Sequence, residues 1–193
     1  MDLNKTITGI FDQSLEAKKK FLSDEANISA IAEAAEALVE CYARGGKVIV
    51  FGNGGSAADS QHLAAELLVK FEKERKPLTA IALTTDTSIL TATSNDYDFK
   101  KVFSRQVEAL ANSSDVAVAI STSGDSENIL EGARAAREKN IPVIALTGRE
   151  GGKLLKKADI AIVVKSDNTA RIQEVHGLII HCICKIVEDA SAG

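Results

Sequence analysis

The sequence predicts an α/β fold, a three-layer αβα sandwich whose central sheet has five parallel strands. Five short apolar stretches, rich in β-branched residues, alternate with longer segments of helical composition. Polar loops follow two of these stretches directly, as is common where strands of a parallel sheet lead into helices. The 193 residues contain only two prolines and no flexible linker. Residues 1–193 are therefore expected to form one domain, with an N-terminal helical arm (1–45) and an α/β core (46–193).

Two helices are expected before the first strand. An apolar stripe from Leu3 to Phe21 predicts a helix over about 3–22, and a second helix over about 28–43 ends at Gly45 and Gly46. A βαβ core does not require these helices. They can cover the sheet or form an arm for self-association, and we expect the second role.

The rest of the chain alternates strands with helices. Strands are expected at about 48–51, 78–83, 116–120, 143–146 and 160–164. Helices are expected at about 56–71, 84–93, 99–110, 129–138 and 169–189, with a polar break over 94–98 and a short helical turn within 148–157. Ser56 and Asp86 are the expected N-caps of the helices that they precede. Ligands of such sheets bind beyond the carboxyl ends of the strands.

A glycine-rich turn, Gly52 to Ser56, follows the first strand. Its glycines can turn sharply and expose their amides, and the following helix adds the positive end of its dipole. The turn therefore favours an anion site, although an ordinary βα turn could contain the same glycines. Its spacing does not fit the Walker pattern and fits the dinucleotide fingerprint only weakly. His62 and Glu66 lie one turn apart on one face of this helix, which suggests chemistry on a phosphorylated substrate.

A second polar loop, Ser121-Thr-Ser-Gly-Asp-Ser126, follows the third strand. Hydroxyls and first-turn amides suit a phosphate dianion. The alternative is a capping box with additional polar residues. Asp125 would repel an anion, so its carboxylate is expected to point outward. Both loops follow strand carboxyl ends and can face one crevice.

Composition excludes several classes of function. The net charge is -4, without a basic block, and aromatic residues are few, which argues against nucleic acid as a ligand. The three cysteines form neither a metal motif nor an even disulfide set, so a reducing compartment is expected. The sequence shows neither a signal core nor an apolar run long enough to span a bilayer, and we expect a cytoplasmic protein without membrane partners.

Three stretches of the sequence, 51–57, 121–126 and 170–176, resemble the sugar isomerase (SIS) domain family, whose fold is flavodoxin-like. The resemblance covers about 38–187 and keeps the order of the family's motifs. It implies an aldose-ketose isomerase that converts sedoheptulose 7-phosphate into D-glycero-D-manno-heptose 7-phosphate, early in ADP-heptose and lipopolysaccharide core synthesis. It also implies a homotetramer with active sites at subunit interfaces.

The resemblance assigns roles to individual residues. Glu66 matches the family's catalytic base and His181 its acid/base partner. The substrate phosphate would be held by Ser121, Thr122, Ser123 and Ser126. The remaining substrate contacts would come from Asn53, Gly54, Gly55, Ser56, Glu66, Asn95, Asp96 and Gln173. One zinc ion per subunit is expected on His62, Glu66, Gln173 and His181. Asp125 departs from the family pattern, in which Asn is commoner.

The last helix contains two histidines with different expected roles. A lone histidine in so apolar a helix would by default be a core residue, and the resemblance favours function for His181 but not for His176. Gln173 and His181 are eight residues apart, about 12 Å along a helix axis. Side chains that far apart can hardly share one ion, so we predict that one metal site takes them from different chains.

Two other interpretations remain open. A non-catalytic SIS protein could bind a sugar phosphate or the replication initiator, but the initiator-associating relatives lack Glu and His at the positions of Glu66 and His181. The same proton transfer could also isomerise an arabinose or hexulose phosphate. The relatives that do so differ around the last helix.

Overall fold

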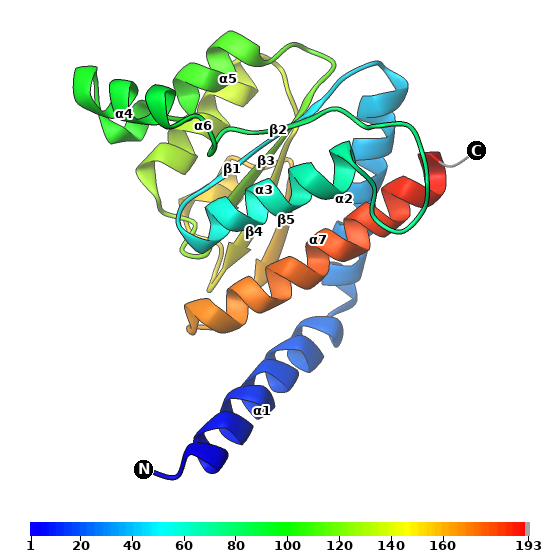
Figure 1. Cartoon of the computed structure of the whole chain (residues 1–193), viewed down its shortest axis with the longest axis vertical. Helices are drawn as coiled ribbons and strands as arrows, with labels where there is room; N and C mark the ends of the chain where they lie inside the picture. Colours follow the sequence, from blue (N-terminus) through cyan, green and yellow to red (C-terminus); the bar gives the residue numbers. More distant parts are fainter. Residues whose placement is uncertain (192–193) are drawn as a thin grey trace.

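A computed structural model describes residues 1–191 of the chain. Its centre is a parallel sheet of five strands, which is the predicted three-layer architecture (Figure 1). The strands run in the order β2-β1-β3-β4-β5. Their bounds are β1 Val48–Gly52, β2 Ala80–Ala82, β3 Val116–Ser121, β4 Val143–Gly148 and β5 Ile160–Val164.

Helices cover both faces of this sheet. One core layer joins alternate strand residues such as Val50 and Val118 to α2, α3 and α7. The other joins Phe51 and Ala119 to α5 and α6. The helices are α1 Leu3–Leu22, α2 Glu25–Ala43, α3 Gly55–Leu68, α4 Thr87–Asp96, α5 Ser104–Leu110, α6 Glu127–Glu138 and α7 Thr169–Ser191, with 3-10 turns η1 Phe99–Lys101 and η2 Lys153–Lys156.

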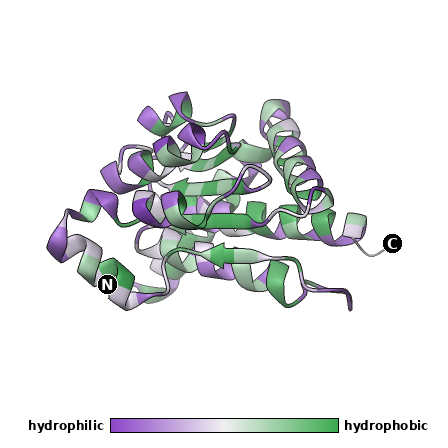
Figure 2. Ribbon diagram, turned by 90° about the horizontal axis from the view of Figure 1, so that it is seen from above, coloured by the Kyte–Doolittle hydropathy of each residue, from purple (hydrophilic) through white to green (hydrophobic). Residues whose placement is uncertain are grey.

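Hydropathy follows this layering. Figure 2 shows the apolar strands in the middle of the molecule and the polar helix faces outside. Strands β1, β3 and β4 are buried along their whole length, as the continuous apolar runs predicted. Within residues 1–191, no helix is long and apolar enough to cross a membrane.

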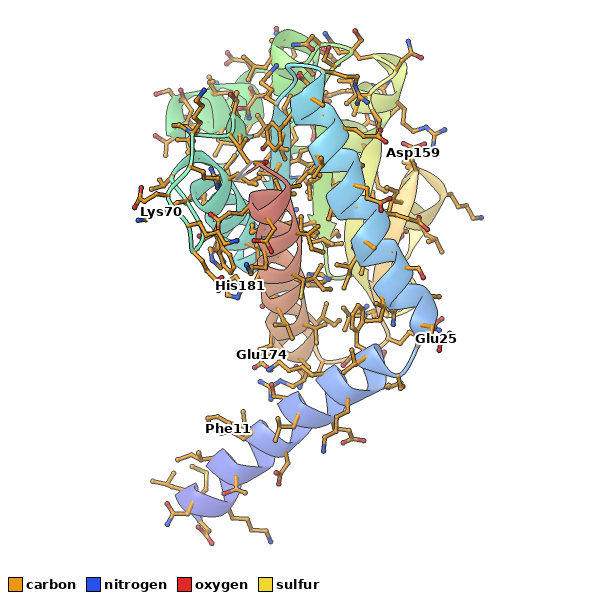
Figure 3. All side chains as sticks on the ribbon, turned by 90° about the vertical axis from the view of Figure 1, so that its right-hand side faces the viewer. Phe11, Glu25, Lys70, Asp159, Glu174 and His181 are labelled. Atoms are coloured by element: carbon orange, nitrogen blue, oxygen red, sulfur yellow. The ribbon has the colours of Figure 1, made fainter. Side chains whose placement is uncertain are left out.

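The first helix projects away from the body of the protein (Figures 1 and 3). Phe21 is its buried residue, whereas Leu3, Ile7, Phe11 and Leu15 are exposed. The guanidinium of Arg171 on α7 donates to the Ile10 carbonyl of α1, 3.0 Å away. Most of the apolar stripe that predicted this helix, from Leu3 to Leu15, therefore faces solvent in a single chain.

Several predicted boundaries were wrong, among them the end of α3, which stops at Leu68 rather than at about residue 71. Ser56 is not the N-cap of α3, because the chain turns at Gly54 (φ 55°) and the helix begins at Gly55. Strand β2 is shorter than 78–83, since the Leu78 amide donates to the Leu67 carbonyl of α3. The break expected over 94–98 begins later, because α4 continues to Asp96, and the segment 99–110 is divided between η1 and α5.

Other predicted boundaries were confirmed. The carboxylate of Asp86 caps α4 by accepting from the Ile89 amide at 2.9 Å. Helix α2 ends as expected at a glycine in the left-handed region, Gly45 (φ 72°). Helix α1 and strand β5 have the predicted bounds.

Candidate active site

Two glycines of the turn between β1 and α3 are in close contact with other groups, and only the contact at Gly52 is with backbone. A Cβ at Gly52 would lie 2.5 Å from the Ser56 carbonyl oxygen. A Cβ at Gly55 would lie 2.3 Å from the side-chain nitrogen of Gln173, which reaches across from α7. The turn is therefore shaped by contacts as well as by backbone freedom, and it brings Gln173 to the N-terminus of α3.

The serine-rich loop leaves the neighbouring strand. Gly52 of β1 is in register with Ile120 of β3, so the two loops start at one edge of the sheet. The Ser121 hydroxyl lies 3.4 Å from that of Ser126 and accepts from the Gly124 amide at 3.2 Å. Strand order reverses between β1 and β3, and such a switch point is where ligands of open α/β sheets bind.

A cavity of about 260 Å³ lies between the two loops. It combines hydroxyls, glycine backbone and the N-terminus of α3 with the amide of Gln173, a set suited to a phosphate group. The lining residues are Asn53, Gly54, Gly55, Ser56, Ile120, Ser121, Thr122, Ser126, Thr169 and Gln173. We call this cavity the anion pocket.

Several sequence-predicted residues do not line the anion pocket. Ser123 supports the loop, because its hydroxyl accepts from the Asp125 amide at 3.2 Å. The Asp125 carboxylate accepts from the Lys153 amide at 3.1 Å and is exposed, so it points outward as expected. Asn95 and Asp96 are exposed at the end of α4, where they hydrogen-bond to each other.

Asn128 contributes to the pocket in a way that the sequence did not reveal. Its side chain exchanges two hydrogen bonds of 2.8 Å with the side chain of Asn53, although the two residues are 75 positions apart. Asn128 is buried at the start of α6 and so ties the serine loop to the glycine turn. An asparagine two positions after the serine-rich loop was the available signal.

A second cluster lies farther along α3 and α7 and consists of His62, Glu66 and His181. The Nε2 atom of His62 is 3.2 Å from Glu66 Oε1 and 3.2 Å from His181 Nε2. One ligand atom from each residue falls within 4.8 Å of the others. His181 is exposed on the side of α7 that faces α3 (Figure 3). We call these three residues the histidine-carboxylate cluster.

The cluster has the donor chemistry of a zinc site. Two imidazole nitrogens and a carboxylate oxygen are common zinc ligands, and catalytic sites often have three protein ligands. Gln173 is not part of this group, since its amide lines the anion pocket. One chain thus brings together three of the four predicted ligands. A fourth ligand from another chain stays a prediction.

The anion pocket and the cluster are separated within one chain. Ser56 and Glu66 are ten residues apart on α3, and Gln173 and His181 are eight apart on α7. These spacings correspond to about 15 Å and 12 Å along the helix axes. The anion pocket therefore lies at the N-terminal ends of α3 and α7, and the histidine-carboxylate cluster lies near the end of α3 and the middle of α7.

His176 is a core residue, as expected. Its side chain is fully buried, and Nε2 lies 3.1 Å from the Thr147 carbonyl oxygen of β4. Burial lowers the pKa of this imidazole to about 4, despite the opposing effect of the hydrogen bond. His176 is thus neutral at neutral pH, and Nε2 carries the proton that it donates.

Comparisons with known proteins agree with this geometry. A profile of the SIS domain matches residues 11–148. The chain is 57% identical over 159 residues to the phosphoheptose isomerase of Campylobacter jejuni, covering 82% of this chain and 86% of that protein. It is 51% identical over 187 residues to that of Dechloromonas aromatica, covering 95% and 94%.

Solved structures show the same similarity. The phosphoheptose isomerase of Neisseria gonorrhoeae superposes with a TM-score of 0.92 at 44% identity, over 97% of this chain and 99% of that one. The match includes α7, which the domain profile leaves out and which carries Gln173 and His181. The chain therefore belongs to the SIS domain family and, within it, to the phosphoheptose isomerase family of phosphosugar isomerases.

Proposed function

We propose that the protein converts sedoheptulose 7-phosphate into D-glycero-D-manno-heptose 7-phosphate. The observation that carries this proposal is the histidine-carboxylate cluster, in which a carboxylate and two imidazoles meet at 3.2 Å. A non-catalytic sugar-phosphate receptor has no need of such a cluster. The names of the curated relatives support a seven-carbon substrate. The product would enter ADP-heptose and lipopolysaccharide core synthesis in the cytoplasm.

The anion pocket would hold the phosphate. The hydroxyls of Ser121, Thr122 and Ser126 and the first-turn amides of α3 would donate to its oxygens, with Ser123 holding the loop in shape. Asn53, Gly54, Gly55 and Ser56 would contact the sugar next to it. Binding energy from the remote phosphate orients the reacting carbons.

Glu66 would transfer the proton between carbons. Its carboxylate takes a proton from C1 of the ketose, the C–H electrons form a C1=C2 double bond, and O2 becomes the enediolate oxygen. His181 protonates O2 and accepts the proton of O1, so that C1 becomes the carbonyl. Glu66 returns its proton to C2. No electrons leave the substrate, and both groups end in their starting states.

Zinc would be held by His62, Glu66 and His181, with Gln173 supplied by another chain. When bound, the ion would act as a Lewis acid that polarises the carbonyl and stabilises the enediolate. Glu66 and His181 would then each have two tasks. His181 would hold the ion through Nε2, which lies beside His62, and exchange protons with the substrate through Nδ1. With Oε1 engaged beside His62, we assign proton transfer to Oε2.

A homotetramer would complete the site. In the single chain α1 exposes Leu3, Ile7, Phe11 and Leu15, and α7 exposes Leu178. An apolar groove lies between α1, α2 and α7. A second copy that covers these surfaces can also bring its cluster to this chain's anion pocket, with Asn95 and Asp96 available to substrate hydroxyls.

The test is turnover of sedoheptulose 7-phosphate by the wild type, Glu66→Gln and His181→Gln. Both substitutions keep size and polarity, and each is expected to lower kcat by about 100-fold or more. Chelator should lower wild-type activity, and added zinc should restore it. Wild-type kcat in Glu66→Gln would contradict the assignment of the base. Full activity after complete metal removal would contradict the role of zinc.

A further inference from the structure

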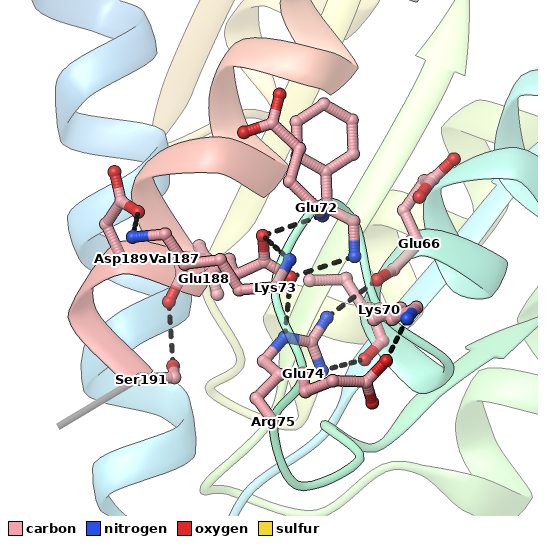
Figure 4. A network of polar contacts seen from close by, with 12 residues as sticks. Glu66, Lys70, Glu72, Lys73, Glu74, Arg75, Val187, Glu188, Asp189 and Ser191 are labelled. Carbon is pink, nitrogen blue, oxygen red and sulfur yellow. Dashed lines mark hydrogen bonds and ion pairs between the residues drawn. The ribbon is translucent and has the colours of Figure 1, made fainter.

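The segment that follows α3 is fastened to α7 by one buried carboxylate. Glu188 is fully buried, and its oxygens accept from the amides of Phe71, Glu72 and Lys73 at 2.8–2.9 Å (Figure 4). Burial raises the pKa of this carboxyl, but the three amides and nearby Arg75 together outweigh it and hold the pKa below its usual value. Glu188 is therefore an ionised side chain with a fixed set of partners.

Arg75 completes the connection to α3. Its side chain is 2% exposed and its Nε lies 3.3 Å from Glu188 Oε1. Its two terminal nitrogens donate to the carbonyl oxygens of Glu66 at 2.7 Å and Leu67 at 2.8 Å (Figure 4). These carbonyls belong to the last turn of α3, where carbonyl oxygens have no donor within the helix. A positive charge at this end also interacts favourably with the helix dipole. Arg75 thus binds the backbone of Glu66 itself.

His181 is connected to the same pair through Phe71. The Phe71 amide is bound by Glu188, and its ring centroid is 5.5 Å from that of His181. His181 lies seven residues before Glu188 on α7. The side chain that holds the segment in place therefore also places an aromatic ring against the exposed imidazole.

We propose that Arg75 and Glu188 are positioning residues that hold Glu66 and His181 in their reactive geometry. This inference rests on the proposed roles of those two groups. A displacement of about 1 Å at a reacting group can lower the rate about 100-fold, so the ends of α3 and α7 must be fixed relative to each other. A buried ion pair is weak support for stability by itself, whereas here each partner binds backbone next to the cluster.

Arg75→Lys is the sharpest test. Lysine keeps the charge and can pair with Glu188, but it lacks the planar fork that reaches two carbonyls at once. We expect kcat to fall about 10-fold or more with KM changed by less than about twofold, because the anion pocket is distant. Glu188→Gln should likewise lower kcat while KM stays nearly unchanged. Phe71→Leu, which leaves the ion pair intact, should lower kcat by a smaller factor.

Two controls separate positioning from stability. Lys73→Ala removes an exposed ion pair (2.7 Å) between the same segment and α7, and should change neither kcat nor Tm. Lys47→Met breaks a pair with the buried Asp115 (2.6 Å) at the amino ends of β1 and β3, outside the Arg75–Glu188 network, and should lower Tm while kcat stays within about twofold of the wild type.

The outcomes are distinct when all variants are assayed well below their Tm. Wild-type kcat in Arg75→Lys and Phe71→Leu would overturn the inference, as would an equal fall of kcat in Lys47→Met at the same loss of Tm. Glu66→Gln in the same series tests the proposed function separately. If it keeps wild-type turnover, the catalytic assignment fails whatever Arg75 does.

Discussion

The side-chain amide of Gln173 lies against Gly55, at the N-terminus of α3, and forms one wall of the anion pocket. Its position depends on the missing side chain at Gly55. The sequence indicated both residues as substrate contacts through the family resemblance, but not that they touch. Contacts of this kind join segments more than a hundred positions apart, and local patterns do not encode them.

Gly55→Ala tests this contact. The new Cβ would lie 2.3 Å from the Gln173 nitrogen, so the flexible amide must move into the pocket. We expect a KM increase of about 10-fold with a small effect on Tm, because a side chain yields more readily than backbone. The control is Gly177→Ala on α7, where a Cβ meets nothing within 4 Å. It should leave KM unchanged and raise stability by up to about 1 kcal/mol. Equal KM values in the two variants would contradict the account.

His176 makes folding sensitive to acid. Its pKa falls from 6.5 to about 4 on folding, so the unfolded chain binds more protons between these pH values. The imidazole is neutral in both states above pH 6.5, and its contribution to stability is lost as the pH falls from about 6.5 to 4. The loss is at most about 3 kcal/mol. The free energy of unfolding of His176→Gln, measured with urea, should fall less than that of the wild type between pH 6.5 and 4. A curve parallel to the wild type would contradict this.

The helices and strands were largely predictable because most carry clear apolar periods or runs. The first and last residues of these elements were less predictable, because contacts with other parts of the fold decide where each element ends. The Leu78 amide donates to the Leu67 carbonyl of α3 and shortens β2, while Gly54 rather than Ser56 is the N-cap of α3. Arg75 and Glu188 show the larger limit. From the sequence alone each would be expected to be a charged side chain on the surface. Their burial follows only from the packing of α3 against α7.

The contacts that Glu188 of α7 makes with Arg75 and with the segment after α3 should weaken in acid. The folded-state pKa of Glu188 lies below its ordinary value of 4.5, so its stabilising effect is fully present above about that pH and is lost as the pH falls through the lowered pKa. Glu188→Gln should therefore be less stable than the wild type at pH 7, with the difference shrinking in more acidic buffer. A difference in Tm that stays constant from pH 7 to about pH 3 would contradict this account.

At the scale of the whole molecule, one chain presents the anion pocket and the histidine-carboxylate cluster at separate places. The eight-residue spacing of Gln173 and His181 on one helix already predicted part of this separation, and α3 separates Ser56 from Glu66 in the same way. The exposed apolar stripe of α1 is the surface on which the proposed tetramer would form contacts between chains. These features favour a site that combines the anion pocket of one subunit with the cluster of another.

Hybrid assemblies test this arrangement. Glu66→Gln damages the cluster, and Thr122→Glu places a negative charge in the anion pocket. Each variant alone should be inactive. Assemblies that contain both should regain activity, because some sites then combine an intact pocket with an intact cluster. The control combines Glu66→Gln with His62→Ala, which damage the same cluster and should not complement. Inactive mixed hybrids of the first kind would show that each site lies within one chain.

The most direct measurement of the central claim is deuterium transfer in D₂O. The wild type should place solvent deuterium at C2 of the aldose during turnover of sedoheptulose 7-phosphate, since the carboxyl proton of Glu66 exchanges between the two transfers. Glu66→Gln should lower both turnover and incorporation by about 100-fold or more while it binds inorganic phosphate as the wild type does. Incorporation at the wild-type rate in Glu66→Gln would show that another group moves the proton.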